Sequence, residues 1–368
     1  MSRRILLCIG LLSVLFFSSA AWGARREVVS RNGDSSRIFK SNIDLSRLST
    51  HSQTPVPPTI LEIVVEDVVA YVGDAPFEEL ATSLDPVPSG PVPPVQVMAV
   101  GDIRQINGQA VRGTYTFRAM PVLTTPNPGP ETGLSIADST RIAQVDHAFE
   151  IFQADGTPVG VIYAYGLGLG PKTPGAPLAA DGGALAIIGG TGPYLAVRGQ
   201  ANTGQPVGDL PLIRFASARE NPAVRRVNGG GTTRFIVHLI PEFAPEVVFL
   251  DETTPALFHA SDQALVTQTD PAIPGEVLTM LVRNLGPTNP GVDPGQPFPR
   301  DPLNIVNSPV DVRVNGEAAV VSFAGGEPTA VNVFEVEFQV PESIPSGRAT
   351  MQTFVGFVAG SQVQFWVE

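Results

Sequence analysis

The amino-acid sequence predicts an all-β protein with two domains, a small antiparallel β-barrel followed by a β-sandwich. Three observations support this prediction. The chain has 37 glycines and 36 prolines among 368 residues, which interrupt every long stretch of helical periodicity. Apolar and polar residues instead alternate with a period of two. Short turn sequences rich in glycine separate these alternating segments at even intervals, so helix is expected to be scarce.

The N-terminus has the layout of a signal peptide. Arg3 and Arg4 precede an apolar run over residues 5–17, and small residues lead to Ala21-Trp22-Gly23. Cleavage is expected between Gly23 and Ala24, giving a secreted protein, extracellular or periplasmic. An apolar run of about 13 residues is too short for a membrane helix, which needs roughly 20. The mature chain is therefore expected to have no integral membrane segment and, because Cys8 is the sole cysteine, no disulfide.

The segment that follows the signal peptide contains too few apolar residues to form a core. Residues 24–58 are rich in serine and arginine and end in Thr54-Pro-Val-Pro-Pro58, which predicts a disordered or extended leader. Proline and glycine also predict loops over residues 85–94, 124–133 and 166–177.

The barrel is expected over residues 59–240. Asp155-Gly156 lies between two alternating segments and is typical of a tight hairpin turn. Gly189-Gly190-Thr191-Gly192 predicts a second turn. The predicted strands are 60–71, 95–103, 113–119, 143–152, 159–167, 183–188, 194–201 and 235–240.

The second domain is expected over residues 247–368, after a junction at 241–247. Asn315-Gly316 predicts a hairpin turn, and about seven strands in this length fit an immunoglobulin-like sandwich. The cysteine pair and core tryptophan of antibody domains are missing. The clearest predicted strands are 277–282, 310–314, 319–323, 334–340, 351–358 and 362–367, with a proline and glycine loop over 284–300.

Composition argues against several functions. There are 23 basic and 35 acidic residues, and no basic stripe is present, so nucleic acid and anionic membranes are poor partners. No Gly-x-Ser-x-Gly elbow marks a nucleophile. Neither a metal nor a cofactor is expected, because the histidines are widely spaced and lack paired carboxylates. They are His51, His147, His238 and His259.

The segment Ala186-Ile-Ile-Gly-Gly-Thr-Gly-Pro-Tyr-Leu-Ala-Val-Arg-Gly199 resembles the dirigent protein signature. The allene oxide cyclase family has a similar glycine turn, but Arg198-Gly199 matches dirigent proteins better, whereas Pro193 departs from them. The resemblance implies a barrel over about 59–240 that orients or cyclises a small apolar or phenolic molecule without metal or redox cofactor. It also implies a homo-oligomer formed through the barrel.

The C-terminal part resembles a module that recurs at the ends of secreted bacterial proteins. The resemblance lies in Pro255-Ala-Leu-Phe258, Leu285-Gly-Pro-Thr288 and Pro294-Gly-Gln-Pro297. This module is similar to the IPT/TIG type of immunoglobulin-like domain.

Polar residues on the predicted barrel strands are candidates for ligand binding. Arg198 and Tyr194 should share one face of a strand, where a guanidinium beside an aromatic ring could steer a ligand. Asp146 and His147 are adjacent and must face opposite sides, so one of them could face the cavity. The remaining candidates are Asp102, Tyr163 and Tyr165. For each residue, a purely structural place on the surface or in the core is the alternative.

The sequence is consistent with two functions. In the first, the barrel binds or orients a small apolar or aromatic ligand, and any catalysis would be of the isomerase or cyclase kind. In the second, the chain is a non-enzymatic extracellular protein that acts through its immunoglobulin-like module.

Overall fold

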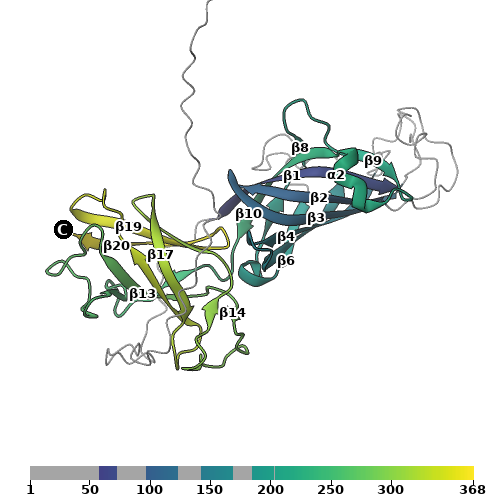
Figure 1. Cartoon of the computed structure of the whole chain (residues 1–368). Coiled ribbons are helices and arrows are strands. Elements are labelled where there is room, and N and C mark those ends of the chain that lie inside the picture. The colour runs from purple at the N-terminus through teal and green to yellow at the C-terminus, as the bar shows by residue number, and fades with distance from the viewer. Residues whose placement is uncertain (1–57, 73–96, 123–141, 169–184, 203) are drawn as a thin grey trace, which may run out of the picture.

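The computed structural model describes residues 58–72, 97–122, 142–168, 185–202 and 204–368 (Figure 1). These residues are almost entirely β, as predicted. The described helical elements are one turn of α-helix, α2 (Arg225–Asn228), and two 3-10 turns, Gly192–Tyr194 and Pro222–Val224. The predicted signal peptide, nearly all of the leader and the proline loops at 85–94 and 124–133 lie outside the described residues, as does most of the loop at 166–177.

Eight antiparallel strands close into a barrel, which confirms the prediction for the first domain. Each strand pairs with the next around the ring, and the last strand, β10, pairs with β1. Two short strands, β8 (Gln205–Pro206) and β9 (Arg214–Ser217), extend the sheet beside β10 and β1. The barrel strands are β1 (Thr59–Val72), β2 (Val97–Ile106), β3 (Gln109–Val122), β4 (Ile142–Phe152), β5 (Pro158–Gly168), β6 (Leu185–Gly190), β7 (Arg198–Ala201) and β10 (Gly231–Ile240).

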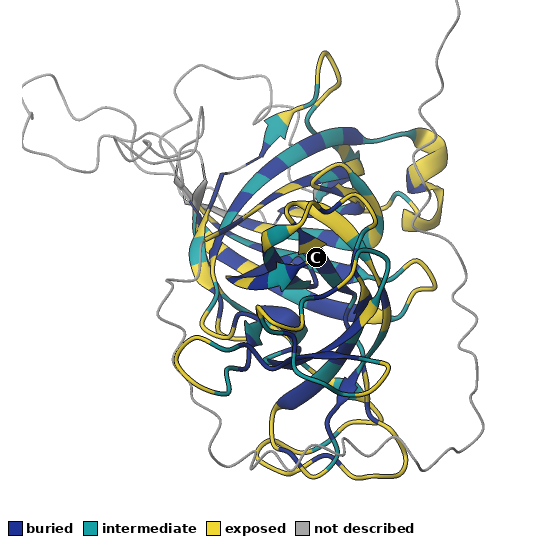
Figure 2. Ribbon diagram, turned by 90° about the vertical axis from the view of Figure 1, so that its left-hand side faces the viewer, coloured by how far each residue is buried: buried dark blue, intermediate teal, exposed yellow. Residues whose placement is uncertain are grey.

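The alternation in sequence becomes an alternation in burial. Along β10, every second residue from Gly231 to Leu239 is buried inside the barrel, and Figure 2 shows the same alternation along neighbouring strands. Gly199 is needed where β7 meets β10, because its φ is +143° and a Cβ there would lie 1.8 Å from the carbonyl oxygen of His238. The predicted Asp155-Gly156 turn joins β4 to β5, with Gly156 at φ +94°.

One predicted strand is wrong in its first half. Residues 194–201 were expected to form a single strand, but the chain makes a 3-10 turn over Gly192–Tyr194 and β7 begins only at Arg198. Pro193 has no backbone N–H to give to a ladder and its φ suits the first turn of a helix. Ala196 then takes φ +58°, which reverses the chain into β7.

The C-terminal module, defined here as residues 246–367, is a second antiparallel sheet. Its strands follow the order β11-β13-β18-β17-β16-β19-β20, and the sheet curves into a nearly closed barrel around one core. Strand β17 pairs with β18 on one side and with β16 on the other, and it has a bulge between Val321 and Phe323. The strands are β11 (Glu246–Val247), β12 (Leu257–His259), β13 (Val277–Arg283), β14 (Thr288–Asn289), β15 (Ile305–Val306), β16 (Val310–Val314), β17 (Glu317–Gly326), β18 (Val333–Gln339), β19 (Gly347–Val355) and β20 (Val358–Val367).

The C-terminal module covers one end of the barrel. Val358, at the start of β20, belongs to the barrel core, and the backbone N–H of Ala359 donates to Thr59 Oγ1 at 3.0 Å. Asn307 Nδ2 donates to the carbonyl oxygen of Pro158 at 2.8 Å. The opposite end of the barrel is where β1, β3 and β5 end and β2, β4 and β6 begin. A ligand that enters the lumen would therefore have to approach from this opposite end.

In the described part of the chain, no helix is long and apolar enough to cross a membrane.

Candidate functional site

A buried polar pair lies inside the barrel lumen. Tyr115 on β3 and His147 on β4 are 2% and 4% exposed, and the Tyr115 hydroxyl lies 3.0 Å from His147 Nδ1. The other ring nitrogen, His147 Nε2, is buried without a hydrogen-bond partner in the structure. A buried polar atom without a partner is costly. This nitrogen is therefore the chemically distinctive atom of the lumen.

Aromatic rings surround the pair. Phe149 and Phe235 lie 5.4 Å and 5.0 Å from the Tyr115 ring, centroid to centroid, and Phe117 lies 4.8 Å from the His147 ring. Phe149 and Phe235 meet edge to face at 5.0 Å. Such aromatic walls suit a flat apolar ligand.

The inward side chains of the barrel differ in size along its length. Towards the end covered by the C-terminal module, the large side chains of Leu61, Ile63 and Leu239 are fully buried. Phe117 lies on the inward face of β3 opposite His147 and is partly buried, whereas His147 itself is buried. Beside Phe117 and His147 lie the small inward side chains of Ala99 and Ala164. Beyond this level the buried inward residues are Ala119, Val97, Val145 and Leu185.

Burial keeps both members of the pair neutral. Desolvation lowers the pKa of His147 to about 3, and desolvation also raises the pKa of Tyr115 well above its usual value. At neutral pH the pair can therefore donate and accept hydrogen bonds but carries no charge.

The structure separates Arg198 and Tyr194, which were expected on one face. Tyr194 is fully buried in the 3-10 turn, and its hydroxyl donates to the carbonyl oxygen of Gly356 at 2.8 Å. Arg198 is exposed on the outside of the barrel, where it lies opposite the exposed Ile240 in the ladder between β7 and β10. The expected shared face is wrong, because the 3-10 turn shifts Tyr194 out of the strand.

Asp102 lies on the outer side of β2 under α2. Its carboxylate accepts hydrogen bonds from Arg225 Nη2 at 2.6 Å and from Arg226 Nε at 2.6 Å. Burial raises the pKa of this carboxyl, but the hydrogen bonds from Arg226 and Arg225 outweigh burial and lower the pKa overall. The cluster fastens α2 to the barrel, and Asp102 does not reach the lumen.

The other candidates also face outward. Asp146 forms an ion pair with Arg118 of β3, with Arg118 Nη2 2.6 Å from the Asp146 carboxylate. Tyr163 and Tyr165 on β5 are 42% and 43% exposed. These three residues lie on the outside of β4 and β5, whereas the pair in the lumen is built by β3 and β4.

Part of the site could be found in the sequence. Of the adjacent pair Asp146 and His147, the structure turns His147 inward. The signal was the phase of β4, in which Val145, His147, Phe149 and Ile151 occupy alternate positions and are all buried. Tyr115 was missed, because nothing in the sequence around it indicates that it faces a histidine 32 residues away.

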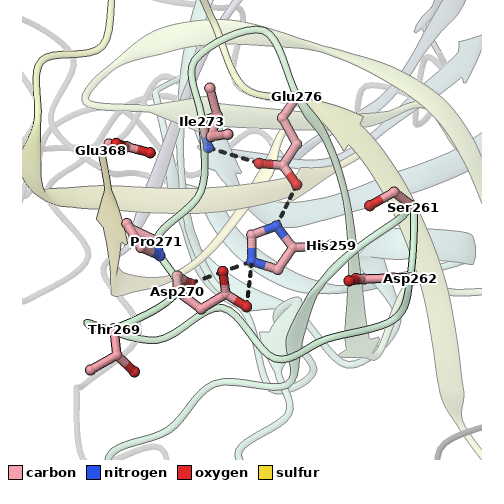
Figure 3. Close-up of a pocket in the computed structure, with 9 residues that line it drawn as sticks. All are labelled: His259, Ser261, Asp262, Thr269, Asp270, Pro271, Ile273, Glu276 and Glu368. Atoms are coloured by element: carbon pink, nitrogen blue, oxygen red, sulfur yellow. Dashed lines mark hydrogen bonds and ion pairs between the residues drawn. The ribbon is translucent and has the colours of Figure 1, made fainter.

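A polar pocket of about 460 Å³ lies in the C-terminal module (Figure 3). His259 of β12 lines this pocket, with Nδ1 hydrogen-bonded to Glu276 and Nε2 3.8 Å from the Asp270 carboxylate. Burial lowers the pKa of His259, but the hydrogen bond and charge of Glu276, with Asp270, outweigh it and raise the pKa. Asp262 and Glu368 also line this pocket, so it is predominantly acidic.

Among the described residues, no group of three or more His, Cys, Asp or Glu side chains is placed to hold a metal ion. The acidic pocket therefore offers no ready-made metal site.

Comparison with known proteins yields little. No family model matches the chain, and no curated protein is similar to it in sequence. A polysaccharide lyase of known structure aligns with 84% of this chain and 40% of its own chain, at 10% identity and a TM-score of 0.17. The chain thus spans less than half of that enzyme, and so low a TM-score supports no inference about fold or function.

Proposed function

We propose that the barrel binds a small apolar or aromatic molecule in its lumen, at the level of Tyr115 and His147, and that the protein does so after secretion. The observation that carries this proposal is the unpartnered, buried Nε2 of His147 in a lumen walled by aromatic rings. A ligand that reached this nitrogen would replace a costly buried polar atom with a satisfied one. The dirigent-like turn sequence at residues 186–199 supports the same function.

The chemistry of the pair favours holding a ligand over transferring protons. A general acid or base works best with a pKa near the ambient pH. With its pKa lowered to about 3 by burial, His147 stays neutral from mildly acidic to basic pH. The proposed activity is therefore binding and orientation of a ligand.

The lumen can be blocked without touching the polar pair. Ala119→Leu would place a larger side chain on the inward face of β3, next to Phe117. Ala148→Leu adds the same volume on the outward face of β4 and is the matched control. N-phenylnaphthylamine, an uncharged dye that fluoresces in apolar sites, is the probe.

We expect the dye to bind the full mature chain and the Ala148→Leu variant equally, and to bind the Ala119→Leu variant at least about tenfold more weakly because the space is filled. Circular dichroism shows whether both variants fold. Equal binding to both folded variants would place the dye elsewhere, and absence of binding to the unmodified protein would overturn the proposal.

A further inference from the structure

We infer that the lumen selects an uncharged ligand with a hydrogen-bond acceptor, which receives a hydrogen bond from His147 Nε2–H, and that Tyr115 is the residue that positions this donor. The inference rests on the proposed function and adds the chemical class of the ligand. Its evidence is the 3.0 Å contact between Tyr115 and His147 together with the unpartnered Nε2.

The hydrogen atoms of the pair can be assigned by counting. A neutral imidazole carries one N–H, and the tyrosine carries one O–H. If the Tyr115 hydroxyl donates to Nδ1, the imidazole proton is on Nε2, and Nε2–H is the single unsatisfied group. If Nδ1–H donates to the hydroxyl oxygen, both the Tyr115 O–H and the bare Nε2 are left without a partner. The first arrangement leaves fewer buried polar groups unsatisfied and is favoured.

This arrangement makes Nε2 a donor. An acceptor atom on the ligand, such as a carbonyl or ether oxygen, would complete the hydrogen bond. A pure hydrocarbon would fill the same space but leave Nε2–H unsatisfied, so it should bind more weakly.

The surroundings of the pair explain why the ligand should be uncharged. His147 stays neutral at physiological pH, and the neighbouring inward side chains on these strands are apolar. Arg118 and Arg198 are exposed on the outside of the barrel, so neither can balance a charge in the lumen. A buried charge without a counter-ion is strongly unfavourable.

Three probes of one size separate these possibilities. Methylnaphthalene is apolar, naphthaldehyde adds an acceptor oxygen, and naphthoate adds a negative charge. Each is measured by displacement of N-phenylnaphthylamine from the full mature chain. We expect naphthaldehyde to bind about tenfold more tightly than methylnaphthalene, because it satisfies the buried donor, and naphthoate to bind most weakly. The preference should be unchanged between about pH 5 and pH 8, since His147 does not titrate there.

Two variants test whether Tyr115 and His147 cause the preference for naphthaldehyde. His147→Phe keeps an aromatic ring but removes the donor, so it should lose the preference for naphthaldehyde over methylnaphthalene. Tyr115→Phe keeps the donor but no longer fixes the tautomer, so the preference should shrink. Nitrogen NMR of the imidazole is a readout that a purely structural tyrosine would not change. It should show the proton on Nε2 in the unmodified protein and a mixture of both tautomers in Tyr115→Phe.

The outcomes distinguish the two proposals. If neither neutral probe displaces the dye, the proposed function fails. If both neutral probes bind equally to the unmodified protein, the lumen binds ligands but the inferred selectivity is wrong. A proton found on Nδ1 of His147 in the unmodified protein would overturn the inference even if the His147→Phe variant did not fold.

Discussion

The Tyr194 hydroxyl donates a hydrogen bond to the carbonyl oxygen of Gly356 at 2.8 Å, across 162 residues of sequence. Tyr194 belongs to the 3-10 turn between β6 and β7 of the barrel, and Gly356 lies in the turn between β19 and β20 of the C-terminal module. Both groups are buried, and Pro193 packs against Gly356 so closely that a Cβ on Gly356 would lie 2.6 Å from the proline ring. The turn of one module thus forms part of the closed end of the other.

Tyr194→Phe tests this contact between the modules. The change keeps the ring but leaves the buried Gly356 carbonyl without its donor, so we expect the free energy of unfolding to fall by about 1–3 kcal/mol. Urea denaturation of the protein comprising residues 24–368 measures the effect. Tyr163→Phe, on the exposed outer face of β5, is the matched control and should stay within about 0.5 kcal/mol. An equally small effect at Tyr194 would mean that the contact does not stabilise the folded protein.

Asp102→Asn tests the cluster under α2. The substitution removes the charge that balances Arg225, which is 6% exposed, so we expect destabilisation of about 3 kcal/mol. Because the pKa of Asp102 is lowered in the folded state, its contribution is present above the ordinary pKa of 3.8 and is lost as pH falls through the folded pKa.

Asp146→Asn is the control for the Asp102 variant. Asp146 also pairs with an arginine, but both side chains are largely exposed, so the loss should not exceed about 1 kcal/mol. Chemical denaturation at neutral pH compares the two variants, and equal losses would contradict the structural role assigned to the buried cluster.

A double-mutant cycle tests the interaction between Tyr115 and His147 by the free energy of unfolding, without any ligand. Tyr115→Phe removes the hydroxyl that is hydrogen-bonded to His147 Nδ1 and should cost about 1–3 kcal/mol, because a buried nitrogen loses its partner. In a His147→Phe background, the same Tyr115→Phe change should cost less, because that nitrogen is already absent. Denaturation of the four proteins gives the coupling energy. Additive effects would show that the two side chains do not interact in the folded protein.

The His259 pocket predicts a dependence of stability on pH. The pKa of His259 is raised from 6.5 in the folded state, so protonation stabilises the fold. This contribution is fully present below pH 6.5 and is lost as pH rises through the folded pKa. We expect the melting temperature to decrease over that range. His259→Gln should flatten this part of the profile, whereas His238→Gln, on β10, should leave it in place. A profile unchanged by His259→Gln would assign the pH dependence to other groups.

Many elements of the fold were predictable because their causes are local. Alternation of apolar residues predicted β1, β4, β5, β16 and β18 to within a few residues. Asn315-Gly316 predicted the turn between β16 and β17, and both residues adopt the expected positive φ, +50° and +86°. Glycine and asparagine tolerate this conformation at low cost, so the chemistry of a few adjacent residues determines such a turn.

The site was predictable only in part. The apolar phase of β4 contained the information that His147 faces inward, but Asp146 was chosen as the ligand candidate. The pairing of Tyr115 with His147 depends on the register between β3 and β4. Asp102 is held in a buried ion pair by Arg225, which lies 123 residues further along the chain. Such contacts depend on how distant strands and turns come together.

The sequence by itself thus determined the all-β class, many of the strands and the tight turns at Asp155-Gly156 and Asn315-Gly316, since the alternation of side chains and the φ preferences of glycine and asparagine act between neighbouring residues. Only the tertiary structure decided which inward side chains lie against one another and which end of the barrel the C-terminal module covers. It also decided that Tyr194 bonds to Gly356 while His147 keeps a nitrogen free in the lumen. The physical reason is that closure of the sheet brings together side chains that are far apart in the sequence. Their burial and their hydrogen-bond partners therefore depend on the whole barrel and on no local pattern.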